Sequence, residues 1–315
     1  MPSRDIVYFS LHPTRDVALN LERAELGQVL RARSWFQYPG GKGLNAARTA
    51  GMLEGRVRAV TMAPPSWRAE VRGFLSRYGV GNRFIPVEGE GRTCVVINEG
   101  SRETVINTDL KMQFTARHYR LVAREVWRAA RRARFVVFAG SLPPALGMRR
   151  YKELMRIASS ASAGLALDQT GKWLSVGCGF RPWIIKPNLR EFSALVGSRP
   201  SAPRQMVSAA RALMANGVGR VLLSLGSRGC LLVSPSGRWF APPVRTGFPP
   251  VSAIGSGDAL LGGFLRSVAE GMAEPEALKW GVAAATANLA RPGACLMTAP
   301  EVKALVPRVE VRDVR

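Results

Sequence analysis

A turn of small residues runs into an apolar segment late in the chain, and it carries the side chain best suited to chemistry. The order is Gly255-Ser256-Gly257-Asp258, followed by Ala259-Leu260-Leu261. A helix that begins on such a turn leaves its first N–H groups without partners and presents positive partial charge to an anion. Asp258 is then placed to take a proton from an alcohol that attacks phosphorus. The motif favours a sugar or nucleoside kinase; the alternative is an ordinary helix start whose Asp adds some tenths of a kcal/mol of dipole stabilisation.

A second glycine cluster, Pro39-Gly40-Gly41-Lys42-Gly43, runs from an expected strand into an expected helix. It is not a Walker A loop, because Gly43 follows the lysine where that motif needs Ser or Thr. It fits a degenerate dinucleotide pattern, but no acidic residue lies about 20 positions further on to hold a ribose. Glycines around a lysine instead favour backbone wrapped closely round a polar ligand, with Lys42 reaching a phosphate.

Four more polar clusters follow expected strands. They are Gly140-Ser141-Leu142-Pro143-Pro144, Asp168-Gln169-Thr170-Gly171, Lys186-Pro187-Asn188-Leu189-Arg190-Glu191 and Ser224-Leu225-Gly226-Ser227-Arg228-Gly229. Ligands of open α/β sheets gather at the carboxyl ends of the strands. We therefore expect these loops to share one crevice.

The elements that must position these clusters alternate along the chain, which is typical of parallel βαβ units. The expected strands cover residues 7–11, 57–62, 135–139, 165–168, 183–185 and 221–225. The expected helices cover residues 44–53, 68–78, 117–133, 202–216, 258–270 and 275–289. No repeat or low-complexity linker divides the chain, so we predict a single domain over residues 1–315.

One segment breaks this alternation. Residues 93–98 and 103–107 are rich in β-formers and are joined by Glu99-Gly100-Ser101-Arg102, which predicts a hairpin. Together with residues 29–39 it would form a small sheet beside the main one, so we expect a lid formed by segments 12–39 and 84–110. A lid matters to a kinase because excluding water prevents loss of the phosphoryl group by hydrolysis.

The composition narrows the class of protein. A chain of 315 residues with 47% hydrophobic content can bury a large core. No apolar run approaches the roughly 20 residues that span a bilayer, so we expect a cytoplasmic protein without a membrane partner. Two histidines give little support to metal sites or histidine-based nucleophiles. The cysteines form no C-x-x-C pair and are expected to be buried free thiols: Cys94, Cys178, Cys230 and Cys295.

The charge balance raises a competing partner. Lysine and arginine total 45 against 22 acidic residues, a net charge of +23, and such a surface attracts nucleic acid. The arginines are spread along expected helices, as over residues 124–134, rather than gathered in a tail. Solvated helix faces therefore explain most of the charge, and a positive field would also favour two anionic substrates.

In their order along the chain, the clusters resemble those of the ribokinase superfamily of carbohydrate kinases, the PfkB family, and most closely its 1-phosphofructokinase and tagatose-6-phosphate kinase branch. Five motifs carry the resemblance: Gly-Gly-Lys-Gly from 40, Gly-Ser-Leu-Pro-Pro from 140, Lys-Pro-Asn-x-x-Glu from 186, Ser-Leu-Gly-x-x-Gly from 224 and Gly-Ser-Gly-Asp from 255. The resemblance implies a ribokinase-like three-layer α/β/α fold with a mostly parallel central sheet and a small β-sheet lid. It also implies ATP with Mg²⁺ and transfer of the γ-phosphoryl group to a sugar phosphate hydroxyl.

The resemblance assigns roles to matching residues. Asp258 matches the catalytic base, and the backbone of Gly255, Ser256 and Gly257 matches the anion hole. The substrate side comprises Asp16, Gly41, Lys42, Asn45 and Arg92, of which Lys42 and Arg92 match holders of the phosphate already on the sugar. The nucleotide side comprises Lys186, Asn188, Ser224, Gly226, Gly229 and Asn288, and Asn188 with Glu191 matches the motif that organises Mg²⁺ and its waters.

Simpler interpretations stay open for the outer residues. Arg92 also fits a hairpin surface charge, and Asp16 a turn acid. Lys186 also fits a solvated strand-end lysine, and Asn288 the packing of an alanine-rich helix.

Two departures from the family pattern concern the sugar more than the chemistry. The first strand of the family commonly ends Asn-Pro-x-x-Asp, whereas this chain has His12-Pro13-Thr14-Arg15-Asp16. The lid hairpin continues Thr108-Asp109-Leu110 instead of the usual Gly-Pro. An imidazole in place of a neutral amide beside the sugar can alter the choice of substrate.

The sequence thus predicts an ATP-dependent ketohexose-phosphate kinase, with fructose 1-phosphate as first choice and tagatose 6-phosphate and fructose 6-phosphate as alternatives. The lysine favours a phosphorylated sugar, because an ammonium facing only hydroxyls would forgo charge-assisted bonds. A sugar-phosphate-binding protein without catalysis and a nucleic-acid binder are the alternatives of other classes. We expect Asp258 and the Lys42 loop to face one cavity. The β edges of the lid offer a surface for a homodimer.

Overall fold

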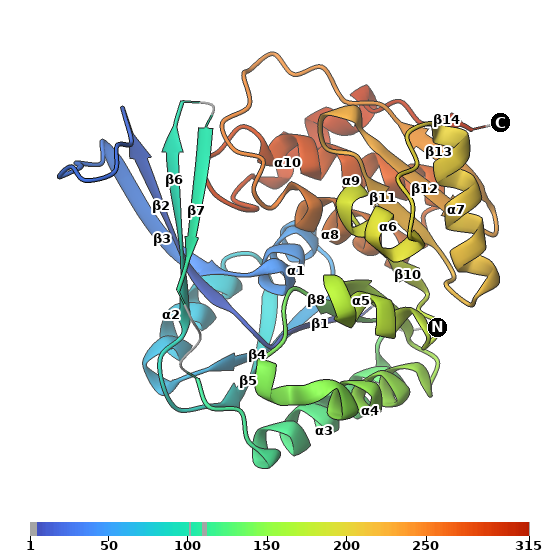
Figure 1. The fold of residues 1–315 in the computed structure, drawn as a ribbon, viewed down its shortest axis with the longest axis horizontal. Helices are drawn as coiled ribbons and strands as arrows, with labels where there is room; N and C mark the ends of the chain where they lie inside the picture. Colours follow the sequence, from blue (N-terminus) through green and yellow to red (C-terminus); the bar gives the residue numbers. More distant parts are fainter. Residues whose placement is uncertain (1–4, 101, 109–111, 315) are drawn as a thin grey trace.

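The main sheet forms the middle layer of the molecule (Figure 1). The computed structural model describes residues 5–100, 102–108 and 112–314. Its parallel strands are β1 (Ile6–Ser10), β4 (Val57–Ala63), β5 (Val80–Pro86), β8 (Phe135–Ala139), β9 (Gly164–Asp168), β10 (Ile184–Ile185) and β11 (Val221–Ser224). Antiparallel strands β12 (Cys230–Ser234), β13 (Gly237–Ala241) and β14 (Arg312–Asp313) extend one edge. In the described residues the order is β14-β13-β12-β11-β10-β9-β8-β1-β4-β5.

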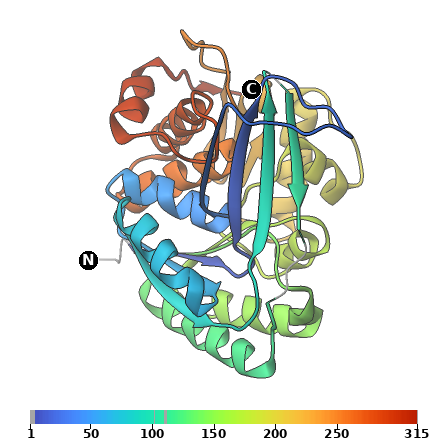
Figure 2. The ribbon, with the colours of Figure 1, turned by 90° about the vertical axis from the view of Figure 1, so that its left-hand side faces the viewer.

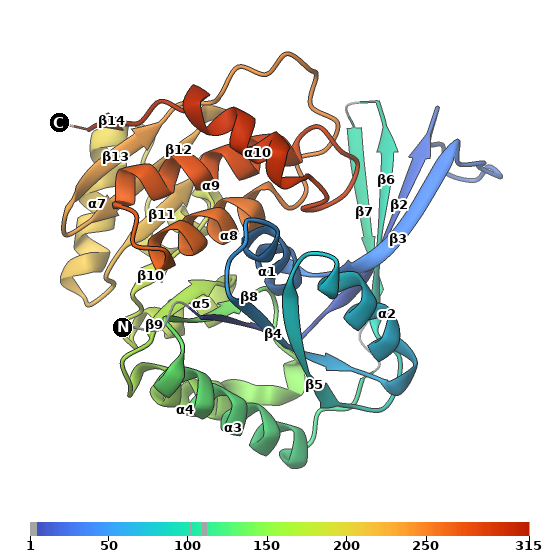
Figure 3. The same cartoon turned by 180° about the vertical axis from the view of Figure 1, so that it is seen from behind.

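Successive residues of the central strands enter two separate cores, one on each face of the sheet. In β1, Ile6 and Tyr8 join one core while Val7 and Phe9 join the other. This burial on both faces explains why the strands read as continuous apolar runs. One face is covered by α1 (Lys42–Met52), α2 (Pro65–Ser76), α8 (Ser256–Ala269), α9 (Glu274–Asn288) and α10 (Ala299–Leu305), several of which are in front in Figure 3. The other is covered by α3 (Ala116–Arg132), α4 (Gly147–Ser159), α5 (Gly171–Cys178), α6 (Leu189–Val196) and α7 (Pro203–Ala215).

A second sheet stands out from the body on one side (Figures 1 and 2). It consists of β2 (Thr14–Leu21), β3 (Ser34–Gly40), β6 (Arg92–Glu99) and β7 (Arg102–Asn107), in the order β3-β2-β6-β7. The expected hairpin is β6 and β7, while Ser101, Asp109 and Leu110 lie outside the described residues. Two boundaries of the expected lid differ: residues 29–33 are not strand, and residues 84–86 belong to β5 of the main sheet.

Every strand and helix expected for the main sheet is present, with ends shifted by a few residues. The sequence missed the helices α4, α5, α6 and α10 and the strands β5, β12 and β13. Of these, α5 and α6 have only eight residues each, which give little periodicity. It also missed β2, whose Arg15, Asp16 and Asn20 mask its alternating burial. The cysteine expectation was half wrong, because Cys94 and Cys178 are only partly buried. In the described ranges, no helix combines the length and apolarity needed to cross a bilayer.

Candidate active site

The turn before α8 is fixed by close packing and by one buried amide. Gly255 has φ 83°, and a Cβ there would lie 2.5 Å from Ala294 Cβ, so only glycine fits without a shift. The amide of Asn288, which is fully buried, donates from Nδ2 to Ile254 O at 2.9 Å and to Ser256 Oγ at 3.0 Å. Its Oδ1 accepts from the N–H of Cys295 at 2.6 Å. Asn288 therefore holds the turn in place, and its predicted contact with the nucleotide stays a prediction.

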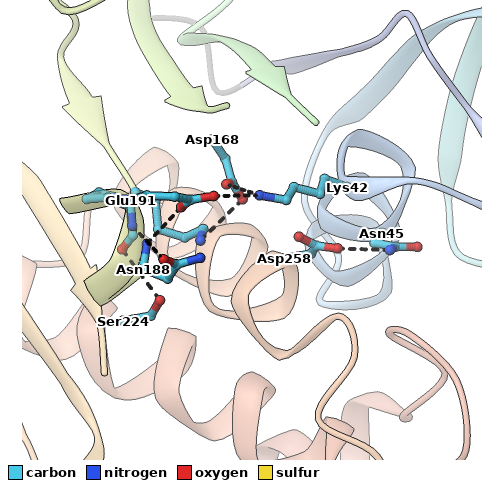
Figure 4. Close-up of polar contacts among 9 residues, drawn as sticks. Lys42, Asn45, Asp168, Asn188, Glu191, Ser224 and Asp258 are labelled. Atoms are coloured by element: carbon cyan, nitrogen blue, oxygen red, sulfur yellow. Dashed lines mark hydrogen bonds and ion pairs between the residues drawn. The ribbon is translucent and has the colours of Figure 1, made fainter. Parts of the chain in front are cut away.

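Asp258 is buried at the start of α8, with only 6% of its surface exposed. Its Oδ2 accepts a hydrogen bond of 2.9 Å from Asn45 Nδ2 on α1, as Figure 4 shows. Burial and the nearby Asp168 carboxylate raise the pKa of Asp258 to about 7, against the opposing effects of Lys42, Asn45 and Lys186. The two glycine clusters thus lie on the same side of the molecule, and the carboxylate does not face bulk solvent. Such a carboxyl group changes protonation near neutral pH, as a general base must.

The amino end of α8 has N–H groups to offer an anion. Ser256 N donates to Ala253 O, whereas the N–H groups of Gly257 and Asp258 have no acceptor in the part of the chain that the structure describes. A Cβ on Gly257 would lie 3.1 Å from Lys186 Nζ, so the lysine lies close to this helix end. Helix dipole and ammonium together concentrate positive charge beside Asp258.

Asp168 links two lysines of the site, although no role of its own was predicted for it. It is fully buried at the end of β9, with Oδ1 3.0 Å from Lys42 Nζ and Oδ2 3.3 Å from Lys186 Nζ. Lys42 Nζ also lies 3.7 Å from Glu191 Oε1 (Figure 4). Burial lowers the pKa of Lys42, but the carboxylates of Asp168, Asp258 and Glu191 outweigh it, and the pKa is raised overall. Lys42 therefore stays an ammonium between the carboxylates.

The Asn188 and Glu191 pair forms the start of α6. Asn188 Oδ1 accepts from Glu191 N at 2.8 Å, and Glu191 Oε2 accepts from Asn188 N at 2.9 Å, which is a capping box. A hollow of about 580 Å³ borders this pair and is also lined by Thr170 and Gly171. The remaining oxygen of Glu191, Oε1, faces Lys42.

The oxygen atoms near this pair suit a hard cation such as Mg²⁺. Glu191 Oε1 is not used by the capping box, and Asp168 Oδ2 is buried without a hydrogen bond in the described ranges, meeting only the Lys186 ammonium. Among the described residues no cluster of three or more His, Cys, Asp or Glu side chains forms a metal cage. A cation held by few protein oxygens, with waters and phosphates completing its shell, fits Mg²⁺.

The predicted sugar side lies where the lid meets the main sheet. Asp16 on β2 is 6% exposed, and burial raises its pKa against the opposing Thr14 hydrogen bond and the charges of Arg48 and Arg92. A Cβ on Gly40 would lie 2.0 Å from Asp16 Oδ2, so glycine is required there. Arg92 lies near Asp16 and His12, whereas the ion pairs of Lys42 run to Asp168 and Glu191. The predicted contact of Arg92 and Lys42 with one phosphate stays a prediction.

His12 is held by the loop after β8. Its Nδ1 lies 2.7 Å from Ser141 Oγ, and its buried Nε2 has no hydrogen-bond partner in the described part of the chain. Burial and the charge of Arg92 lower the pKa of His12 to about 4, so the imidazole is neutral at pH 7. A neutral ring with one free nitrogen can bond to a sugar hydroxyl.

Arg48 is a second residue that sequence reasoning missed. It is fully buried on α1 and donates to the carbonyl oxygens of Pro39 at 3.0 Å and Cys295 at 3.2 Å, as well as to Ala294 O. Its Nη2 also donates to Asn45 Oδ1 at 3.1 Å, which orients the amide that bonds Asp258. Its guanidinium carbon lies 4.8 Å from the ring centre of Phe74. An arginine in a helix usually indicates a solvated face, and only the packing reveals this role.

The outer residues of the predicted nucleotide side lie on and around the β11–β12 connection. Ser224 pairs with Asn188, its N–H donating to Pro187 O at 3.0 Å. Gly226 and Gly229 have φ angles of 61° and 95°, and a Cβ on Gly229 would lie 2.1 Å from Ala241 O. Gly41 has φ 100° and is the N-cap residue of α1, directly after β3. These glycines are required by the turns, and their contacts with ligands stay predictions.

A buried carboxylate at the amino end of a helix, opposite lysines at the carboxyl ends of parallel strands, is the arrangement of an α/β phosphotransferase. The chain belongs to the pfkB family of carbohydrate kinases, whose model matches residues 9–301. It is therefore a sugar kinase, a phosphotransferase with an alcohol group as acceptor, and the resemblance seen in the five motifs is confirmed at the level of the family.

Known proteins similar to the chain share its full length. The 1-phosphofructokinase of Escherichia coli K12 is 25% identical over 313 residues, which cover 98% of this chain and 99% of the relative. An ATP-dependent 6-phosphofructokinase isozyme 2 of Mycobacterium tuberculosis is 28% identical, covering 95% and 88%. The structure of a possible 1-phosphofructokinase from Thermotoga maritima superposes with a TM-score of 0.86 at 22% identity, covering 99% and 100%. The predicted ribokinase-like fold is confirmed.

Proposed function

We propose that this kinase transfers the γ-phosphoryl group of ATP to fructose 1-phosphate, giving fructose 1,6-bisphosphate, with Asp258 as general base. The observation that carries the proposal is the placement of Asp258. It is buried beside free N–H groups of its own helix, and Asn45 from the Lys42 helix bonds one of its oxygens. A carboxylate kept so close to an anion site serves a purpose only if it accepts a proton there.

In the proposed reaction the sugar hydroxyl oxygen attacks the γ-phosphorus, and the bond from that phosphorus to the β–γ bridging oxygen breaks. ADP leaves with the electron pair, and the hydroxyl proton passes to Asp258. We assign the proton to Oδ1, because Oδ2 already accepts from Asn45 Nδ2. The N–H groups of Gly257 and Asp258 face the charge that develops on the phosphoryl oxygens. The protonated carboxyl group later releases its proton to solvent.

Lys42 is assigned to the phosphoryl group in transit. Its ammonium lies between Asp168 and Glu191 and is close enough to Asp258 to affect its pKa. This position agrees better with the path of the γ-phosphate than with a phosphate resting beside Arg92. Arg92, with Asp16 and the neutral His12, is then left to hold the sugar phosphate.

Members of this family take the phosphoryl group from ATP. Glu191 and Asn188 would hold Mg²⁺ largely through water, with the Asp168 carboxylate nearby. When it is bound, the cation would neutralise negative charge on the nucleotide phosphates. Lys186 and the β11–β12 turn would lie along those phosphates.

An ADP-release assay tests the substrate. The panel is fructose 1-phosphate, tagatose 6-phosphate, fructose 6-phosphate, fructose and ribose. We expect the highest kcat/KM for fructose 1-phosphate and low values for the unphosphorylated sugars. The Mycobacterium relative makes fructose 6-phosphate the principal competitor. A preference for fructose 6-phosphate or tagatose 6-phosphate would replace the substrate but keep the mechanism, whereas a preference for plain sugars would contradict the roles of Arg92 and Lys42.

We also propose that two copies associate through their lids. Bulky apolar side chains on the lid strands are exposed, namely Trp35 at 62%, Ile106 at 51% and Val105 at 47%. A homodimer would cover these apolar side chains together with the edges of β3 and β7. Light scattering should give a dimer for the wild type and a monomer for Trp35→Glu; a monomeric wild type would rule the association out.

A further inference from the structure

A hollow of about 1070 Å³ opens at the end of the main sheet where the parallel strands begin, opposite the candidate active site. It lies between the beginnings of β1, β4 and β5 and the last turns of α3. Of these elements, β4, β5 and α3 are labelled in Figure 3. The candidate active site lies at the carboxyl ends of strands in the same sheet. The proposed reaction uses no residue of this hollow.

The lining of the hollow is strongly basic. It holds five arginines and two carboxylates, which leaves an excess of three positive charges: Arg56, Arg58, Arg83, Arg128, Arg132, Asp5 and Glu125. Like charges gathered on a concave surface repel one another and focus the field inside it. A bound anion would remove this repulsion.

One buried carboxylate organises part of the wall. Glu125 is 8% exposed, and its Oε1 lies 2.9 Å from Arg128 Nη1 and 3.5 Å from Arg83 Nε. Arg124 Nε, also on α3, lies 3.9 Å from the same oxygen. Glu125 thereby anchors two guanidinium groups from α3 and one from β5. Each guanidinium carries five N–H donors, so a single carboxylate oxygen leaves most of them available.

Two further arginines have no anionic partner. Arg58 on β4 and Arg132 at the end of α3 are exposed, and neither takes part in an ion pair or side-chain hydrogen bond within the described ranges. Both line the hollow. Their charges are therefore free to meet a ligand.

We propose that this hollow binds a small anion carrying two or more phosphate groups. Guanidinium forks pair with phosphate oxygens bidentately, and more than one phosphate is needed to balance three excess charges. A nucleic acid would call for a basic track along the surface, whereas these arginines are gathered in one concavity. The site is independent of the sugar substrate.

Titration calorimetry with inorganic tripolyphosphate tests the proposal. The test variant is Arg58→Ser/Arg132→Ser. The matched control is Arg117→Ser/Arg120→Ser, which removes the same charge from exposed positions at the other end of α3. We expect the test variant to lose at least about tenfold in affinity at one site, and the control to stay within about twofold. Hydrogen exchange of the wild type should show protection by tripolyphosphate at residues 55–58 and 79–83.

Equal losses in the two variants would overturn the proposal, because the anion would then follow overall charge. Protection confined to residues 255–258 would overturn it too, by placing the anion at the active site. A single-stranded RNA that binds more tightly than tripolyphosphate and loses affinity in the same variant would show a nucleic-acid surface instead. Thermal unfolding checks that both variants fold, as expected for exposed side chains.

Discussion

The two halves of the candidate site differ in how completely their polar groups are paired. Around Asp258, a chain of hydrogen bonds runs from buried Arg48 through Asn45 to the carboxylate. Asp168 lies between two ammonium groups, and its Oδ2, which makes no hydrogen bond in the described residues, is still ion-paired with Lys186. On the sugar side, His12 Nε2 and Arg92 Nε are buried without hydrogen-bond partners in the described residues. Buried polar atoms are rarely left so unless a ligand satisfies them. The comparison indicates that the chemistry is preorganised, while the sugar side is completed by its substrate.

The largest effect is expected at Asp258. Asp258→Asn keeps the size of the side chain but removes the base, so kcat should fall at least about a hundredfold with little change in ATP affinity. Steady-state ADP release and nucleotide titration measure the two quantities. Wild-type turnover in the variant would remove Asp258 from the role of base.

The same variant has a control that does not depend on activity. Because the pKa of Asp258 is raised by folding, its contribution to stability is present below the unfolded pKa and is lost as pH rises through about 7. Asn carries no such pH dependence. Relative to the wild type, the variant should therefore gain on the order of a few degrees in Tm between pH 4 and pH 8. If the Tm of the variant is lower than that of the wild type at every pH, its lost activity would be attributed to misfolding.

A second change tests which half of the site Lys42 serves. If the ammonium contacts the phosphoryl group in transit, Lys42→Ala should lower kcat about tenfold or more, because stabilisation of the transition state is lost. Lys303→Ala on α10, a lysine whose ion pair runs to exposed Glu54, is the control. A rise in KM for phosphorylated sugars alone, with kcat kept, would return Lys42 to the phosphate already on the sugar.

The smallest effect is expected on the sugar side, at His12. His12→Asn restores the amide that the family pattern leads one to expect and should change the ratio of kcat/KM between fructose 1-phosphate and fructose 6-phosphate by about threefold or more. The kcat with the better sugar should change less than the ratio. An unchanged ratio would mean that His12 serves only to pack against Ser141.

The sequence could predict those parts of the site that a local pattern encodes. The turn before Asp258 and the loop before Lys42 combine glycines with a functional side chain within a few residues, and the structure brings both to one end of the sheet. The central parallel strands were equally readable, because burial on both faces makes them continuous apolar runs. The edge strand β5 was missed, because Gly81, Asn82 and Arg83 interrupt its apolar pattern.

Asp168 and Arg48 could not be found in this way. Asp168 matters because the ends of β9 and β10 converge with α1, and no pattern near it records the lysines it meets. Arg48 looks like one more charge on a basic helix until aromatic rings and carbonyl oxygens are seen around it. Long-range contacts of this kind exist only in the folded chain.

The proposed mechanism depends most on the carboxylate of Asp258, whose pKa is raised by burial and by the neighbouring charge of Asp168. The base form rises with pH through a pKa of about 7, so kcat/KM for the phosphorylated sugar should rise over this range in the wild type. Asp168→Asn removes the nearby negative charge, which lowers the pKa of Asp258 and should shift the rising limb to lower pH. Asp313→Asn, an exposed carboxylate on β14, should leave the limb in place. A flat profile, or the same shift in both variants, would contradict the assignment of Asp258 as the base.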